Sequence, residues 1–232
     1  MLSVVYEDNH LLIVQKPAGM LSQGDATGDA SLVDEAKAYV KEKYHKPGEV
    51  YIGLVHRLDR PVGGLVALAR TSKAAQRLTE QLKSREMKRE YLGVAQGEIA
   101  AALTLHNWLR KNEQSGNVDV LPAEAPDAQE ALLTVQPLAC QGGTTLLHIC
   151  LDTGRKHQIR AQLKAAGHPL KYDMRYGTGE RGENVALWGA ALRLTHPTRK
   201  EPMLFLSSPE GKAFEDYRET IAAFLTERRE RG

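Results

Sequence analysis

A cluster of charged side chains near an apolar run is the part of this sequence best suited to chemistry. His56, Arg57, Asp59 and Arg60 fall within five residues, shortly before the run Leu65–Ala69. A neighbouring positive charge favours the ionised form of a carboxylate, so Asp59 is a candidate nucleophile. The structural alternative is that Asp59 caps a turn or pairs with an arginine to hold a loop. The cluster by itself leaves both interpretations open.

Short strands and helices on either side of the cluster are expected to hold it in place. Alternating or continuous apolar runs between turn residues predict strands. Apolar residues at helical spacing, behind a Ser or Thr that can cap, predict helices. These patterns give strands over Val4–Tyr6, Leu11–Val14 and Leu65–Ala69, a helix from Ser31 to about Tyr44, and a second helix that Thr71-Ser72 opens.

The second half of the chain is richer in strands. Predicted strands cover Tyr91–Ala95, Thr104–Leu109, Ala131–Val135 and Thr144–Leu151. A helix is expected from Thr153 to the stop at Gly167, with Lys156, Arg160 and Lys164 on one face, and a last helix from about Phe214 to Arg228. Strands mixed with segregated helices predict an α+β fold, with a mixed, mainly antiparallel sheet flanked by helices. We expect a single catalytic domain over residues 1–232.

The positive charge of the chain is concentrated in two blocks. The formal net charge is only +2, yet residues 51–100 hold 9 basic against 5 acidic residues, and residues 151–200 hold 10 against 4. If the two blocks meet in the fold, they form a basic surface of the kind that binds a phosphate backbone. Chance segregation of charge is the alternative.

The composition is that of a soluble globular protein. Hydrophobic residues make up 42% of the chain and charged residues 26%, which is enough to bury a core. No apolar run approaches the roughly 20 residues that cross a bilayer, and the first residues lack the layout of a signal peptide. Cys140 and Cys150 are too few for a disulfide framework and lack the spacing of a zinc site. We expect reduced thiols, no metal and a cytoplasmic location.

Three separated motifs resemble those of the RluA-type family of RNA pseudouridine synthases. The charged cluster, His56-Arg-Leu-Asp-Arg60 followed by Gly64-Leu65, resembles the family's active-site signature. Lys88-Arg-Glu-Tyr-Leu92 resembles the segment with its active-site tyrosine, and Thr153-Gly-Arg-Lys-His-Gln-Ile-Arg160 resembles its third signature. Further matches, in the expected order, are Lys16–Gly19, Gly167–Pro169, Asp173–Gly177, Leu192–Pro197 and Ser208-Pro209.

The resemblance implies isomerisation of specific uridines in RNA without a cofactor. The N1–C1′ bond breaks, the base turns, and C5 joins C1′. The resemblance makes Asp59 the catalytic carboxylate, leaving open whether it acts on the sugar or the base, and makes Arg160 its partner. It places Tyr91 against the target uracil and Arg57 in the space that a flipped nucleotide leaves. Weaker candidates for backbone contacts are Arg155, Lys156, His157 and Lys164.

The implied partner is a stem-loop of transfer or ribosomal RNA, with no obligatory protein partner evident. The sequence departs from the family pattern at Val62-Gly63, at Trp188 and at Lys171, so support of the catalytic loop is expected to differ. We also expect the catalytic domain to act without the small basic RNA-binding domain that many relatives carry in front.

Two other functions use the same residues. An N-glycosidase would need a second carboxylate beside Asp59, for which Asp173 is the candidate. A non-catalytic RNA-binding or RNA-folding module would keep the motifs as scaffold only. Loss of isomerisation in an Asp59 variant that still binds RNA separates both from an isomerase.

Overall fold

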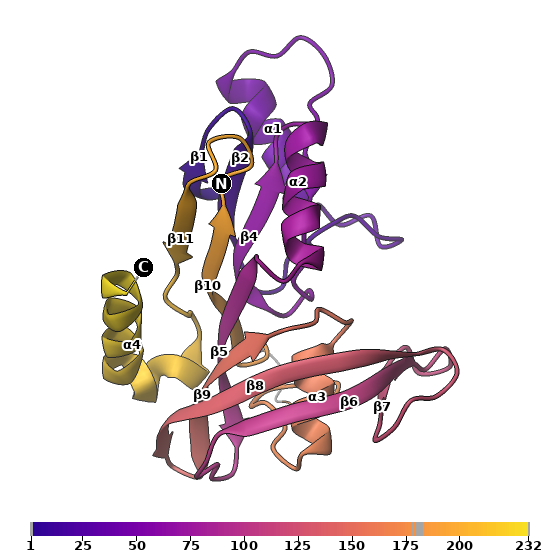
Figure 1. Ribbon diagram of the computed structural model, residues 1–232, viewed down its shortest axis with the longest axis vertical. Coiled ribbons are helices and arrows are strands. Elements are labelled where there is room, and N and C mark those ends of the chain that lie inside the picture. Colours follow the sequence, from indigo (N-terminus) through magenta and orange to yellow (C-terminus); the bar gives the residue numbers. More distant parts are fainter. Residues whose placement is uncertain (1, 178, 180–182, 232) are drawn as a thin grey trace. The chain divides into compact units, whose positions relative to one another are not determined.

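In the computed structural model, which describes residues 2–177, 179 and 183–231, the chain folds as two units (Figure 1). The first unit comprises the chain up to Lys88 together with Gly189–Ser207, and the second comprises Arg89–Trp188 and Ser208–Arg231. The charged cluster therefore belongs to the first unit. The prediction of a single domain over residues 1–232 stays a prediction.

Antiparallel strands form the framework of the first unit. Strand β2 pairs with β1 on one side and with β4 on the other, so that Ile13 stands opposite Ala67, and β10 pairs with β11. Strands β2 and β4 are almost completely buried, as expected for continuous apolar runs at the centre of a sheet, whereas β1 and β11 are partly exposed. The strand bounds are β1 Ser3–Glu7, β2 Leu11–Lys16, β3 Gly53–Leu54, β4 Gly63–Ala69, β10 Leu187–Thr195 and β11 Pro202–Leu206.

Two helices complete the first unit, and both begin where capping residues predict. Helix α1 (Leu32–Lys43) starts after Ser31, whose hydroxyl accepts from the N–H of Asp34, and α2 (Ser72–Lys83) starts after Thr71 in the same way. Helix α2 buries Ala74 and Leu78 in the apolar core between helix and sheet. The first-half strands and both helices are thus confirmed to within a few residues.

The second unit is a five-stranded antiparallel arrangement in the order β5-β9-β8-β6-β7. In Figure 1 the long strands β8 and β6 run beside each other with α3 behind them, and α3 contacts β6 and β7. The α+β class with mainly antiparallel strands is confirmed. The bounds are β5 Lys88–Gln96, β6 Leu103–Lys111, β7 Val118–Leu121, β8 Ala128–Gln141, β9 Thr144–Leu151, α3 Gln158–Ala165 and α4 Arg218–Glu230.

Helix α3 differs from the prediction in a way that matters for the basic residues. It begins at Gln158 and not at Thr153, because His157 has a left-handed backbone with φ of 54°. Lys156 therefore precedes the helix, and Arg160 is only 4% exposed. The prediction that Lys156, Arg160 and Lys164 share one helical face is therefore wrong.

The end of the chain also differs. A 3-10 helix, η1 (Lys212–Tyr217), comes before α4, so the expected single helix is broken at its start. Phe224, and not Leu225, continues the buried side. Strand β7 was not predicted, and Ser208-Pro209 follows β11 without forming a strand. Among the described residues, no helix has both the length and the apolar character required to span a membrane.

Candidate active site

A tight turn after β2 fixes the backbone of the charged loop. The Ser22 hydroxyl donates to the carbonyl oxygen of Leu58 at 2.7 Å and accepts from the Leu58 N–H at 3.1 Å. The N–H of Gly19 donates to the carbonyl oxygen of Arg60 at 2.8 Å. Because these contacts flank Asp59 on both sides, they hold the backbone that carries its carboxylate.

Lys16, the last residue of β2, adds a buried positive charge to this turn. Its side chain has no exposed surface, and its ammonium donates to the carbonyl oxygens of Pro17, Met20 and Arg60. Burial lowers the pKa of Lys16 to about 8, and the negative charge of Asp59 partly opposes this fall. The two charges therefore interact, and the ammonium supplies a fixed positive field beside the half-buried Asp59.

After the Asp59 loop, the chain enters β4 at a position where two backbone segments lie so close that only glycine fits. Gly64 has φ of +123°, and a Cβ built on it would lie 2.3 Å from the backbone nitrogen of Gly189. Just before it, the Val62 N–H donates to the carbonyl oxygen of Asp59, which closes a turn. The sequence differs from the family pattern at Val62-Gly63, but the turn that Val62 closes is still formed. The close approach to the backbone of Gly189 depends on Gly64, which follows these two residues.

The remaining polar residues of the cluster make different contacts. His56 is buried and its Nε2 accepts from the backbone N–H of Ala67, which ties the loop to β4. Arg60 pairs with the exposed carboxylate of Asp29 at 2.7 Å. Arg57 is exposed and forms no ion pair within the described part of the chain, so its guanidinium can reach a ligand.

In the second unit, Arg160 and Asp173 form a buried ion pair. The guanidinium donates from Nε at 2.7 Å and from Nη2 at 2.8 Å to the two carboxylate oxygens. Backbone N–H groups of Arg175 and Tyr176 also donate to Asp173. Burial opposes ionisation of Asp173, but the hydrogen bond and charge of Arg160 outweigh it and hold the pKa below its usual range.

Tyr91 lies on β5 opposite Ile149 and is 5% exposed. Asp59 and Arg57 thus belong to the first unit, and Tyr91 and Arg160 to the second. The assignment of these four residues to one active site stays a prediction, as does the pairing of Asp59 with Arg160.

The weaker candidates gather near the β6–β7 hairpin. Lys156 donates to the carbonyl oxygen of Gly116, and Lys164 lines a groove of about 590 Å³ that also includes Arg175. Arg155 is exposed and its Nε donates to the carbonyl oxygen of Glu130, while His157 shares a hydrogen bond with the hydroxyl of Tyr176. Lys156 and Lys164 therefore border one region even though they do not share a helical face.

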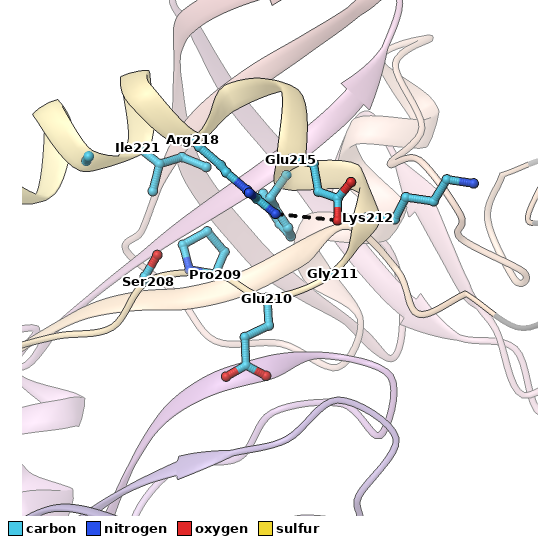
Figure 2. A pocket seen from close by; sticks show the side chains of 10 residues that line it. Ser208, Pro209, Glu210, Gly211, Lys212, Glu215, Arg218 and Ile221 are labelled. Atoms are coloured by element: carbon cyan, nitrogen blue, oxygen red, sulfur yellow. Dashed lines mark ion pairs between the residues drawn. The ribbon is translucent and has the colours of Figure 1, made fainter.

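A second hollow of about 500 Å³ lies beneath η1 and the start of α4 (Figure 2). Two of its charged side chains form an ion pair, Arg218 with Glu215 at 3.6 Å. None of the predicted site residues lines it. The hollow is therefore separate from the candidate active site.

Sequence reasoning missed the residues that position Asp59. Lys16 lay in a motif but received no role, and Ser22 was not singled out. A lysine at the end of an apolar strand and before a Pro-Ala-Gly turn is the one signal that pointed to it. Buried charges are rare unless they are paired, so a lysine in that position predicts carbonyl partners nearby.

Comparisons with known proteins identify the family of the chain. The family described as RNA pseudouridylate synthase matches residues 10–165. Ribosomal large subunit pseudouridine synthase C of Vibrio vulnificus is 30% identical over 91% of this chain and 67% of its own length, and that of Escherichia coli (strain K12) is 31% identical over 86% and 64%. The chain thus spans about two thirds of the length of these relatives.

Among solved structures, Human RNA Pseudouridylate Synthase Domain Containing 4 has the same fold, with a TM-score of 0.75 at 18% identity. The likeness covers 95% of this chain and 93% of that one. Together with the match over residues 10–165, which includes the loop of Asp59, Tyr91 and all of α3, these findings show that the chain belongs to the RNA pseudouridylate synthase family, as its RluA-type motifs predict.

Proposed function

We propose that this protein isomerises uridine in RNA to pseudouridine with Asp59 as the catalytic carboxylate. One observation carries the proposal: the loop of Asp59 is pinned by the Ser22 and Gly19 hydrogen bonds and lies in the field of the buried Lys16 ammonium. An ionised carboxylate on a fixed backbone is preorganised to act on the sugar or the base without first changing its position.

The reaction balances without any added group. The N1–C1′ bond breaks, C5 bonds to C1′, the C5 proton is lost, and N1 takes up a proton. Asp59 forms the transient bond or removes the proton, and Tyr91 lies against the uracil face, where its hydroxyl can assist proton removal. Arg57 fills the space that the flipped nucleotide leaves in the RNA, since an exposed guanidinium can both stack and donate.

Arg160 is proposed as the partner that orients Asp59. Its guanidinium is buried and is itself held by Asp173, so it would present a rigid donor. The same pair argues against an N-glycosidase, which needs a carboxylic acid that can give up a proton near neutral pH. Asp173 is a poor acid for that purpose, because Arg160 and two backbone N–H groups stabilise its ionised form.

Ribosomal RNA is the substrate class to test first. The curated relatives carry the name ribosomal large subunit pseudouridine synthase, and transfer RNA remains the second class. A cytoplasmic location is part of the proposal, because it is compatible with a ribosomal substrate. We propose that contacts to the RNA backbone come from the basic residues beside the β6–β7 hairpin, Arg155, Lys156, His157 and Lys164.

The test uses RNA labelled with tritium at C5 of uridine, because joining C5 to C1′ releases that hydrogen. Wild-type protein should release tritium, and Asp59→Asn should fall below about 1% of that rate, since a positioned catalytic carboxylate is worth at least about 10²-fold. The control is Asp127→Asn, the same change at an exposed aspartate whose left-handed backbone suits asparagine.

RNA binding by Asp59→Asn is measured in parallel. Unchanged binding with lost turnover supports the proposal. Turnover near the wild-type rate refutes the role of Asp59. Free uracil in the wild-type reaction points to a glycosidase, and binding without any turnover by the wild type points to a non-catalytic module.

A further inference from the structure

Three side chains of different chemistry meet on one face of the β5–β9 strand pair in the second unit. Nε2 of His148 lies 2.8 Å from Oε2 of Glu90 and 3.4 Å from Sγ of Cys150. The three side chains together bring one nitrogen, one oxygen and one sulfur atom within 4.8 Å of one another. The spacing along the sequence did not indicate this site, because Glu90 is 58 residues from His148.

Strand register explains why these groups converge. His148 and Cys150 are two residues apart on β9, so their side chains point to the same face of the sheet. Glu90 stands opposite Cys150 in the β5–β9 ladder, and side chains of directly opposed residues lie about 5 Å apart on a common face. Two strands thus present all three groups in a fixed geometry.

Helix α4 covers the cluster and removes it from water. Glu90 is 7% and His148 4% exposed, and the ring of Phe224 lies 4.8 Å from the imidazole ring. Cys150 is partly exposed, which leaves a path to the thiol. The cluster is therefore enclosed on the helix side and open at the sulfur.

We propose that Glu90, His148 and Cys150 form a binding site for a zinc-type divalent cation. Thiolate, imidazole and carboxylate are the ligands that Zn²⁺ takes in proteins, at about 2.0 to 2.3 Å. A tetrahedral ion with such bonds holds its ligand atoms about 3.5 Å apart, so the His148–Cys150 separation of 3.4 Å already fits. A water molecule would complete the fourth position.

Binding must displace a proton from the thiol. Burial raises the pKa of Cys150 to about 11, so the thiol is neutral near pH 7 in the absence of an ion. Coordination forms the metal–sulfur bond and releases the thiol proton to solvent. The imidazole would bind through Nε2, so the proton that Nε2 shares with Glu90 would move to Nδ1 in the other neutral tautomer, and the hydrogen bond to Glu90 would be lost.

Arg228 of α4 competes with a cation for the same charges. Its Nη2 lies 3.3 Å from Oε2 of Glu90 and 3.4 Å from the imidazole nitrogens of His148. The side chain is 25% exposed, so the guanidinium can turn outward to water. Arg228→Gln should therefore strengthen zinc binding, because it removes a positive charge from the site without removing a ligand.

The proposed zinc site and the side chain of Tyr91 lie on opposite faces of β5, since Glu90 and Tyr91 are consecutive residues of that strand. A bound ion would link β5 to β9 at Glu90, one residue from the tyrosine. The inference does not rest on the proposed isomerase activity, and its test does not measure turnover.

The experiment titrates untagged, chelator-treated protein with Zn²⁺ in competition with a chromophoric chelator, and with Co²⁺ to record a sulfur-to-metal charge-transfer band. Wild type should bind one ion per chain and show the band. Cys150→Ser should lose the band and bind more than about tenfold more weakly, since even indirect ligand support is worth about 10-fold to 100-fold. Cys140→Ser is the matched control, at the exposed cysteine of β8, and should behave as wild type.

A second measurement uses the wild-type protein, so that its result does not depend on whether the variants fold. Zn²⁺ should protect Cys150 from alkylation, as mapped by mass spectrometry, while Cys140 continues to react. Absence of a charge-transfer band in the wild type, equal protection of both cysteines, or equal affinity of the two serine variants would overturn the proposal, and the last result would mean an adventitious ion only.

Discussion

Lys16 should make the protein more stable as the pH rises in the alkaline range. Its ammonium is fully buried and donates to three carbonyl oxygens. Burial lowers its pKa from 10.5 to about 8, and the charge of Asp59 offsets only part of that fall. The folded protein therefore releases the Lys16 proton at a lower pH than the unfolded chain does.

The sign and size of the effect follow from proton linkage. Between pH 8 and 10.5 the unfolded chain retains the Lys16 proton while the folded protein has lost it, and stability rises with pH wherever the unfolded state binds more protons. A pKa difference between 10.5 and about 8 corresponds to about 3 kcal/mol. The buried charge thus costs about that much at pH 7, and the cost disappears as the pH approaches the unfolded pKa.

The assay is urea unfolding at steps from neutral pH to about 10.5 for wild type and Lys16→Met, which keeps the length of the side chain without its charge. The difference between the two unfolding free energies should change by about 3 kcal/mol over this range, in favour of the wild type at high pH. Lys43→Met is the control, because a hydrogen bond to Glu7 raises the pKa of Lys43 and removes any such gain. Parallel pH curves for wild type and Lys16→Met would refute the reasoning.

Four further outcomes are expected. Gly64→Ala should destabilise the fold by about 3 kcal/mol or more in urea unfolding, because its Cβ would meet the β10 backbone at 2.3 Å and its φ is +123°; a stable variant contradicts the close approach. Asp173→Asn should cost about 3 to 5 kcal/mol at neutral pH, since it leaves a buried guanidinium without its counter-charge. The pKa of Asp173 is lowered in the fold, so this contribution is present at neutral pH and is lost as the pH falls through the folded pKa, and the variant should lack that part of the acid dependence. Tyr91→Phe should retain RNA affinity but lose much of the tritium-release rate, and a wild-type rate would assign it to packing alone. Replacing Lys156 and Lys164 together by Gln should flatten the log–log dependence of RNA affinity on salt by one to two contacts, each worth about 0.7 on single strands, and an unchanged slope would remove them from the RNA surface.

Local signals were enough for most of the fold. The two helices of the first unit start at Ser31 and Thr71 because a hydroxyl before an amphipathic run satisfies the first N–H groups. Strand β7 was not predicted, because Val118–Leu121 has only four residues and includes Asp119, a residue type that is uncommon in strands. It is stabilised by its partner β6 and by the hydroxyl of Tyr176, which accepts from the Val118 N–H, and neither contact is visible in a local pattern.

Residues of the candidate site could be predicted where a reactive side chain lies within a sequence motif. Residues that support the site through contacts with distant parts of the chain could not. Asp59 could be singled out because its neighbours in the sequence are charged. Ser22 could not, because its value lies in two hydrogen bonds to Leu58, which is 36 residues away. A serine in a turn has many ordinary uses, so only the fold shows that this one holds the loop of Asp59.

Arg160 shows why a periodic pattern misplaces a buried charge. A spacing of four residues grouped it with Lys156 and Lys164, but the helix begins only after His157, whose backbone is left-handed, and the guanidinium of Arg160 is paired with Asp173 in the interior. Asp173 occupies Nε and Nη2, two of the three guanidinium nitrogens, and a guanidinium carries five N–H donors in a fixed fork. The pair with Asp173 holds the guanidinium in one orientation, so Arg160 is a rigid group, and its pairing with Asp59 stays a prediction.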